Sequence, residues 1–431
     1  MSRKHAAAEE TVLVIEAIGA RGDGIAHCGG EAVYIPFTAP GDRARVRLGQ
    51  RRGEGRAGEL VALLQPGARA TPRCPHFGVC GGCALQHLAA AAYVEAKTGL
   101  VTAALRQHGL VAAEIAPLER VLPGTRRRAR FAVQRPRAAS AAAAIGFMGR
   151  ASHRVVDMTA CAVLHPALVA LAGALRQAAA RFWPPGAASA ATATVSDTGI
   201  DLLLDLAALP DLAMLEALAA FAEAQDLARL GWRAPDAAEP TPAAIRRPPR
   251  VVFSGVPVEL PPDAFLQASI EAEAMLVRAV LAGIGAAERV VDLHAGLGTF
   301  SLALAQRAAV HAVDGSRAAV AALAAAAARA GIHRLGSECR DLDARPLLPA
   351  ELAPFDAAVF DPPRAGAKEQ AAALAGSALR RVVAVSCNPA SFARDARLLV
   401  DGGFHLTRVQ PIDQFLWSPH VELVAWFERS G

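Results

Sequence analysis

Short apolar runs separated by turn residues fill the first part of the chain. They cover residues 11–18, 32–37, 44–48 and 57–64. A glycine-rich stretch, G-A-R-G-D-G, separates the first two runs. Short strands at this spacing predict a small, five-stranded, OB-like β-barrel at about 11–67. Such barrels often bind RNA, and a structural adaptor would have the same pattern.

The middle of the chain mixes two periodicities. Strand-like alternation occurs at 128–134, 143–148 and 198–206, and a helical period of alanine and leucine occurs at 165–181 and 209–229. Together these segments predict an α+β arrangement. The following stretch, 233–250, contains five prolines, which by composition predict a loop or linker.

From residue 251 onward, strands and helices alternate. A helical pattern at 266–284 is followed by strand-like segments at 289–293, 310–314, 357–361, 381–386 and 421–427. This alternation predicts an α/β, Rossmann-like, doubly wound sheet, whose ligands bind at the carboxyl ends of the strands. We therefore expect three domains, namely the barrel (1–68), the α+β central domain (69–250) and the α/β domain (251–431).

Composition bears on the cellular compartment. Hydrophobic residues make up 53% of the chain, but the apolar runs are broken well before the length of a membrane span. The first residues, M-S-R-K-H-A-A-A-E-E, lack the apolar core of a signal peptide. We expect a cytoplasmic protein without a membrane partner, in which thiols stay reduced and clustered cysteines favour metal over disulfides.

Positive charge is concentrated in one region. The chain has a net charge of +5, yet residues 51–150 alone hold fifteen Lys or Arg against five Asp or Glu. Nearly all of the basic residues are arginines, which bind phosphate in a bidentate manner and stack on bases. A genome that encodes arginine in preference to lysine explains why the basic residues are arginines, but it does not explain why positive charge is concentrated in one region. We therefore expect RNA as a partner.

Three of the seven cysteines lie within the ten residues C-P-H-F-G-V-C-G-G-C. They are Cys74, Cys80 and Cys83. A four-thiolate site needs one more ligand. The candidates for it are Cys28, Cys161 and Cys339, and spacing does not choose between them. The C-x5-C-x2-C form is near the spacing of plant-type ferredoxins, and it fits either an iron–sulfur cluster or a zinc site.

The segment V-V-D-L-H-A-G-L-G-T-F at 290–300 reads as a strand, a glycine turn and a helix. Gly296 and Gly298 allow a ligand to approach the backbone closely. Asp314 ends the next strand, where an acid can accept both ribose hydroxyls. This D-x-x-x-G-x-G form differs from the G-x-G-x-x-G of dinucleotide sites, so it favours S-adenosylmethionine over NAD.

Two further strands end in polar loops. F-D-P-P-R at 360–364 places Asp361 before two prolines that stiffen the loop, and V-S-C-N-P-A presents Cys387 after the next strand. Glu422 lies at the edge of the last strand. Carbon 5 of uracil attacks a methyl sulfonium only after a thiolate has added to carbon 6, and a base must then remove the carbon-5 proton. Cys387 and Glu422 fit these two functions, on a nucleotide that is single-stranded or flipped out.

At this point the chain resembles the bacterial RNA uracil-5-methyltransferases, in particular the ribosomal-RNA branch with a TRAM barrel and an iron–sulfur cluster. The likeness covers almost the whole chain. Its carriers are the barrel at about 11–67, the cysteine motif, R-R-R-A-R, F-L-Q at 265–267, D-L-H-A-G-L-G-T-F, F-D-P-P-R-A-G, S-C-N-P-A and P-H-V-E. The combination of S-C-N-P with the cysteine motif is the most specific of these.

The resemblance implies a function for each candidate residue. Cys161 becomes the fourth ligand of a [4Fe–4S] cluster, Cys387 the nucleophile and Glu422 the base. The cofactor pocket is expected to contain Gln267, His294, Thr299, Asp314, Asp341 and Asp361, the last of which is also near the target base. The chain departs from the commonest family residues at Ser269, His294, Ala295 and Thr299. These differences affect the expected cofactor contacts, but not the functions expected for Cys387 and Glu422.

The implied protein is a monomeric enzyme that converts a uridine of 23S ribosomal RNA to 5-methyluridine. A transfer-RNA uracil-5-methyltransferase has the same motifs. An amino-group methyltransferase is a second alternative, but Arg364 stands where its D-P-P motif needs an aromatic residue. The third alternative is a non-catalytic RNA-binding protein that has kept the fold.

Overall fold

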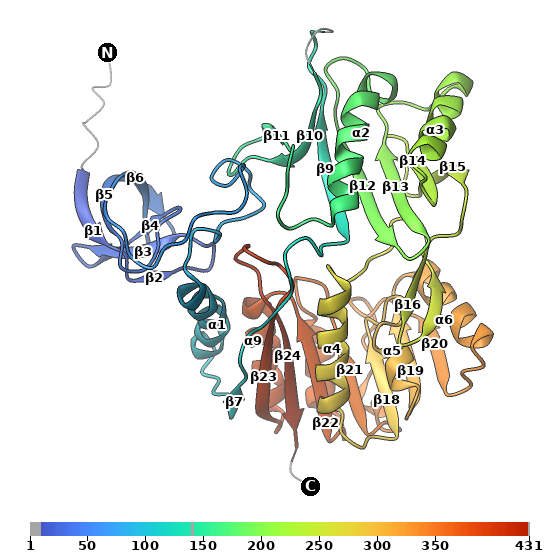
Figure 1. Cartoon of the computed structure of the whole chain (residues 1–431). Coiled ribbons are helices and arrows are strands. Elements are labelled where there is room, and N and C mark those ends of the chain that lie inside the picture. Colours follow the sequence, from blue (N-terminus) through green and yellow to red (C-terminus); the bar gives the residue numbers. More distant parts are fainter. Residues whose placement is uncertain (1–9, 139–141, 430–431) are drawn as a thin grey trace, which may run out of the picture.

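The computed structural model describes residues 10–138 and 142–429, which form three large sheets (Figure 1). The N-terminal sheet lies at one side, the central sheet above and the C-terminal sheet below in this view. Among the helices of these described ranges, none is long and apolar enough to cross a membrane.

The N-terminal sheet has six strands in the spatial order β1-β5-β6-β4-β3-β2. They are β1 (Glu10–Val14), β2 (Ala17–Ile18), β3 (Gly24–Cys28), β4 (Glu31–Ile35), β5 (Arg43–Arg52) and β6 (Gly55–Gln65). The sequence predicted five strands. The sixth arises because Ala17 and Ile18 pair with β3 across the glycine-rich turn. Within the described part of the chain no strand pairing joins β1 to β2, so the expected closed barrel is not observed.

The central sheet has seven strands in the order β11-β10-β9-β12-β13-β14-β15. Its strands are β9 (Arg128–Gln134), β10 (Ala144–Met148), β11 (Val155–Asp157), β12 (Ala188–Ser196), β13 (Gly199–Asp205), β14 (Arg229–Arg233) and β15 (Thr241–Ile245). Helices α2 (Pro166–Phe182) and α3 (Leu212–Ala224) pack on it around a shared apolar core. The expectation of a linker at 233–250 was wrong in part, because β15 lies there. Its Pro242 is tolerated since β15 is the edge strand.

The C-terminal sheet contains the alternating elements expected from the sequence. Its order is β20-β19-β18-β21-β22-β24-β23-β7, where β7 is the short strand Glu114–Ile115, and β24 is antiparallel to both of its neighbours. The strands are β18 (Arg289–Leu293), β19 (Ala309–Asp314), β20 (Leu335–Cys339), β21 (Ala357–Phe360), β22 (Arg381–Ser386), β23 (His405–Asp413) and β24 (Glu422–Glu428). The strand order reverses between β18 and β21, and such a switch point is where ligands of open α/β sheets bind.

Helices cover both faces of this sheet. They are α4 (Ile270–Gly283), α5 (Ser301–Leu304), α6 (Arg317–Arg329), α7 (Pro349–Leu352), α8 (Lys368–Ala375) and α9 (Pro389–Asp401), and the short hairpin β16 (Arg250–Phe253) and β17 (Val256–Glu259) packs near α6. Along β22, Val382 and Ala384 join one buried core while Val383 and Val385 join another. This alternation explains why the strand reads as a continuous apolar run.

One segment of the expected central domain packs with the C-terminal sheet instead. Helix α1 (Ala90–Gln107) contributes Val101 and Leu105 to the core beneath β22 and α9. Strands β7 (Glu114–Ile115) and β8 (Glu119–Arg120) extend the same sheet by pairing with β23. The chain therefore crosses to the C-terminal sheet before it forms the central one.

Candidate active site

Strand register brings Cys387 and Glu422 together. Ser386 of β22 pairs with Leu423 of β24 in antiparallel register, so the next residues along each strand are cross-strand neighbours. Those residues are Cys387, which is partly buried, and Glu422, which is only 2% exposed. A thiol and a carboxyl group thus face each other where β22 ends.

The S-C-N-P segment forms a tight turn between β22 and α9. The Asn388 side chain accepts a hydrogen bond from the backbone N–H of Ala390 and caps the helix, and Pro389 occupies its first position. The backbone N–H of Asn388 in turn donates to the Ser386 hydroxyl. Proline is favoured at this position because its N–H would have no partner there. The turn therefore fixes Cys387 at the carboxyl end of the strand.

The D-P-P-R loop after β21 is tied to this turn. The carbonyl oxygen of Arg364 accepts hydrogen bonds from the Asn388 side-chain amide and the Ser391 hydroxyl, both at 3.0 Å. The Arg364 guanidinium lies 3.4 Å from Nδ1 of His420, in the segment that leads to Glu422. Asp361 begins the loop and lies at the end of β21, beside β18 and β22.

A chain of buried side chains connects Asp361 to Glu422. Gln267 donates from Nε2 to Asp361 at 3.3 Å and accepts at Oε1 from Nε2 of Gln414 at 3.0 Å. The same Nε2 of Gln414 donates to Glu422 at 2.5 Å. The backbone N–H of Ala268 donates to Oε1 of Gln414 and fixes its orientation. The sequence analysis missed Gln414, whose only signal was a polar residue within the apolar stretch after β23.

These groups shift one another's ionisation. Burial raises the pKa of Glu422 to about 8, and the nearby Asp361 carboxylate adds to this effect. Burial likewise raises the pKa of Asp361 to about 7, opposed by its hydrogen bond from Gln267. The pKa of Cys387 rises to about 11 because of burial and the charges of Glu422 and Asp361, while Arg364 opposes the rise. Such displaced acids and thiols are typical of functional sites.

The glycine turn after β18 lies at the neighbouring strand end. His294 and Gly298 both have positive φ, at 60° and 88°. A Cβ on Gly298 would lie 2.3 Å from Leu323 Cδ1, so only glycine fits beneath α6. Thr299 follows directly and is partly buried. The backbone here is held in a conformation that most residues avoid, which agrees with a turn shaped for a ligand.

Acidic residues surround this turn. Asp314, at the end of β19, accepts hydrogen bonds from the backbone N–H groups of Gly296 at 2.9 Å and Ser316 at 2.7 Å. Asp341 follows β20 and caps its own exposed turn. The Nε2 atom of His294 is buried without a hydrogen-bond partner in the described part of the chain, and burial lowers the pKa of this imidazole. An unpaired buried nitrogen beside two acids suits a polar ligand such as a nucleoside.

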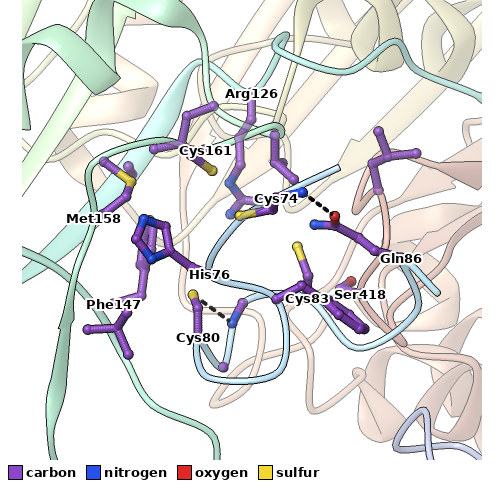
Figure 2. Close-up of a pocket in the computed structure, with 18 of the residues that line it drawn as sticks. Cys74, His76, Cys80, Cys83, Gln86, Arg126, Phe147, Met158, Cys161 and Ser418 are labelled. Carbon is purple, nitrogen blue, oxygen red and sulfur yellow. Dashed lines mark hydrogen bonds between the residues drawn. The ribbon is translucent and has the colours of Figure 1, made fainter. Parts of the chain in front are cut away.

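A separate cavity of about 510 Å³ contains all four of the cysteines named by the resemblance. Figure 2 shows Cys74, Cys80, Cys83 and Cys161 around the same space, with Arg126 and His76 beside them. Burial raises the pKa of Cys80 and Cys161, and that of Cys83 to about 12. Within residues 10–138 and 142–429, no three His, Cys, Asp or Glu side chains are grouped closely enough to hold one metal ion.

Comparison with known proteins identifies the family. Residues 349–430, which include Asp361, Cys387 and Glu422, match the tRNA (uracil-5-)-methyltransferase family. An uncharacterized RNA methyltransferase of Brucella suis biovar 1 is 42% identical over 415 residues, or 96% of each chain. The 23S rRNA (uracil(1939)-C(5))-methyltransferase RlmD of Chromohalobacter salexigens is 34% identical, over 97% of this chain and 89% of that protein. The chain belongs to the RNA uracil-5-methyltransferase family.

The fold of this RNA methyltransferase also matches a solved structure. The tRNA (uracil-54, C5)-methyltransferase of Pyrococcus abyssi, in complex with S-adenosyl-L-homocysteine, superposes with a TM-score of 0.73 at 22% identity. The match covers 96% of this chain and 98% of that one. The expectation of a Rossmann-like methyltransferase fold is thereby confirmed, and the family makes the protein an RNA methyltransferase.

Proposed function

We propose that this enzyme methylates carbon 5 of a uridine in 23S ribosomal RNA through a covalent bond between Cys387 and carbon 6. The observation that carries the proposal is the position of Cys387 and the buried Glu422, which lie directly beyond the paired residues Ser386 and Leu423 on neighbouring strands. A thiol alone at a strand end has many uses, whereas a thiol facing a carboxyl group of raised pKa suits addition followed by proton removal.

The reaction follows from these positions. S-adenosylmethionine supplies an electrophilic methyl group. Cys387, as thiolate, adds to carbon 6, and the electron pair of the resulting enolate forms the bond from carbon 5 to the methyl group. The carbon–sulfur bond of the methyl donor breaks, and S-adenosylhomocysteine leaves. Glu422, as carboxylate, removes the carbon-5 proton, and the re-forming double bond expels the Cys387 thiolate. Gln414 donates a hydrogen bond to Glu422 and holds the carboxyl group in place during this exchange.

The glycine turn and its neighbours form the proposed cofactor pocket. We assign to it Gln267, His294, Thr299, Asp314, Asp341 and Asp361. The buried, unpaired Nε2 of His294 and the two carboxylates beside the turn suit the polar groups of a nucleoside. Asp361 lies between this turn and Cys387, because β21 lies between β18 and β22, so it is placed to contact both cofactor and base.

We further propose that Cys74, Cys80, Cys83 and Cys161 hold a [4Fe–4S] cluster. All four line one cavity, and four thiolates suit either zinc or such a cluster. It contributes no electron to methyl transfer, and its effect is to hold the cysteine loop against the central sheet. The N-terminal sheet is the proposed TRAM-type RNA-binding unit.

Ribosomal RNA is favoured over transfer RNA as substrate. The relative named for 23S ribosomal RNA is 34% identical over nearly the whole chain, whereas the transfer-RNA enzyme is 22% identical. Both names fit the same chemistry, and the test below separates them.

The proposal is tested by trapping with 5-fluorouridine. The anaerobically purified enzyme is incubated with S-adenosylmethionine and transcripts of 23S ribosomal RNA or transfer RNA that contain 5-fluorouridine. Fluorine at carbon 5 cannot leave as a proton, so a covalent, methylated adduct at Cys387 is expected on the ribosomal transcript by mass spectrometry. An adduct only on transfer RNA would change the substrate. No adduct from enzyme that binds both cofactor and RNA would remove the Cys387 mechanism.

A further inference from the structure

We propose that Lys97 and Tyr93 of helix α1 are positioning residues for Glu422. They bind the segment 413–421, which leads from β23 to Glu422 and carries Gln414. The inference rests on the proposed function, in which Glu422 removes the carbon-5 proton. It adds that α1, which is remote in sequence from every catalytic motif, sets where that carboxyl group lies.

Lys97 is fully buried and directs its whole ammonium group at this segment. Its Nζ lies 2.6 Å from Oδ1 of Asp413, whose side chain is also 0% exposed. The same Nζ donates to the carbonyl oxygen of Phe415 at 3.2 Å and to that of His420. An ammonium group has three hydrogens, and here each has an acceptor between residues 413 and 420. Lys97 therefore ties both ends of the segment to one point.

Tyr93, one turn earlier on α1, makes a second pair of bonds to the same segment. Its hydroxyl donates to Oδ2 of Asp413 at 2.5 Å and accepts from the backbone N–H of Trp417 at 2.8 Å. The carbonyl oxygen of Trp417 accepts from the N–H groups of Ala84 and Leu85, which follow Cys83 directly. The segment is thus held from α1 on one side and from the cysteine loop on the other.

These contacts reach Glu422 by a short path. Asp413 is followed by Gln414, whose side chain binds Glu422 and Gln267. In addition, Ile412 pairs with Glu422 between β23 and β24. Cys387 lies instead on the turn between β22 and α9, and none of the hydrogen bonds of Lys97 or Tyr93 described above goes to that turn. A change at Lys97 is therefore expected to displace the base and spare the nucleophile.

The test compares two steps of the reaction in two variants. Lys97→Met alone leaves the Asp413 carboxylate buried without its partner, which is strongly destabilising, so the variant is the double substitution Lys97→Met with Asp413→Asn. The second variant, Tyr93→Phe, removes one donor and one acceptor and keeps the ion pair. Both are assayed on the RNA on which the unsubstituted enzyme forms its 5-fluorouridine adduct.

We expect turnover of ordinary RNA to fall about 10- to 100-fold, the usual consequence of a catalytic group displaced by about an ångström. Adduct formation on 5-fluorouridine RNA needs no proton removal, so its rate should stay close to that of the unsubstituted enzyme. The covalent, methylated adduct should also accumulate on ordinary RNA. A purely structural ion pair would not separate the two rates.

The matched control is Arg229→Met with Asp201→Asn, which removes a largely buried ion pair of the central sheet whose atoms lie 2.7 Å apart. This variant should not lower the rate of turnover relative to the rate of adduct formation. Unchanged turnover in the Lys97 and Tyr93 variants, or equal loss of turnover and adduct formation, would overturn the inference. Absence of any adduct from the unsubstituted enzyme would instead overturn the proposed function itself.

Discussion

At the scale of single residues, Glu422 combines two demands that oppose each other. A base must lose its proton, yet this carboxyl group is 2% exposed and near Asp361, and both conditions favour the protonated form. The hydrogen bond from Gln414 favours the carboxylate and limits the rise of the pKa. The result is a group whose pKa of about 8 lies close to neutral pH, where a general acid or base works best.

This raised pKa predicts a cost in stability that depends on pH. The ordinary pKa of such a group is 4.5, so between about pH 4.5 and 8 the unfolded chain has lost this proton while the folded protein keeps it. The free energy of unfolding must therefore fall as pH rises through this window. Glu422→Gln, which can still accept from Gln414, removes the effect, and we expect it to gain on the order of 3 kcal/mol over the unsubstituted enzyme by pH 8.

The measurement is urea-induced unfolding of both proteins at pH 5, 6.5 and 8. Glu428→Gln serves as control, because Glu428 lies at the other end of β24 with a half-exposed side chain. An equal growth of the stability difference with pH in this control would show that the effect does not come from the burial of Glu422. A constant difference for Glu422→Gln across the series would show that the carboxyl group titrates normally.

At the scale of elements, the sequence predicted most of the C-terminal sheet because its strands are apolar runs bounded by glycine turns and helices. It could not predict the register of β22 against β24, which makes Cys387 and Glu422 neighbours. The residues of the two segments do not indicate that these strands pair, or in what alignment. It also placed α1 with the central domain. That assignment followed the order of the segments along the chain, whereas the apolar side chains of Val101 and Leu105 pack in the core beneath β22.

For the cysteine loop, the spacing of the cysteines left the fourth ligand open between Cys28, Cys161 and Cys339. The structure allows a more specific prediction. Cys161 lines the cavity with Cys74, Cys80 and Cys83, whereas Cys28 belongs to β3 of the N-terminal sheet. From the proposed cluster we expect Cys161→Ser to hold much less iron and sulfide than the unsubstituted protein and to melt at a lower temperature, because the binding of a metal group contributes to folding.

Cys28→Ser is the matched control and should keep the iron content and visible absorption of the unsubstituted protein. Iron, sulfide and zinc are measured on anaerobically purified samples. Stoichiometric zinc with no iron would contradict the cluster, and equal iron in the two variants would contradict Cys161 as a ligand.

At the scale of the whole molecule, the N-terminal and central sheets meet through charged side chains. Asp23 of the N-terminal sheet is 1% exposed and binds both Arg52 of the same sheet and Arg150, which follows β10. Arg150 also lies over the ring of Phe37 at 4.9 Å. These bonds connect the N-terminal and central sheets beside a groove of about 1050 Å³.

The walls of this groove carry arginines of two kinds. Arg150 is bound to Asp23, and Arg135 donates to the carbonyl oxygens of Ala180 and Trp183, so both are held in place by the protein. Arg137 and Arg154 line the same groove with exposed side chains. Exposed guanidinium groups in a groove formed by the cysteine loop and the central sheet suit the phosphates of a single-stranded segment, and we expect the RNA to pass here.

Replacing Arg137 and Arg154 together by alanine should therefore weaken RNA binding and reduce its dependence on salt. Each phosphate contact releases counterions, so the slope of log affinity against log salt concentration should become shallower by about 1 to 2. Affinities are measured by filter binding of the same transcript at several salt concentrations. The control is Arg106→Ala with Arg329→Ala, which removes the same charge from exposed positions on α1 and α6 outside the groove. An equal change of slope in both double variants would mean that only net charge matters, and that the RNA does not contact this groove.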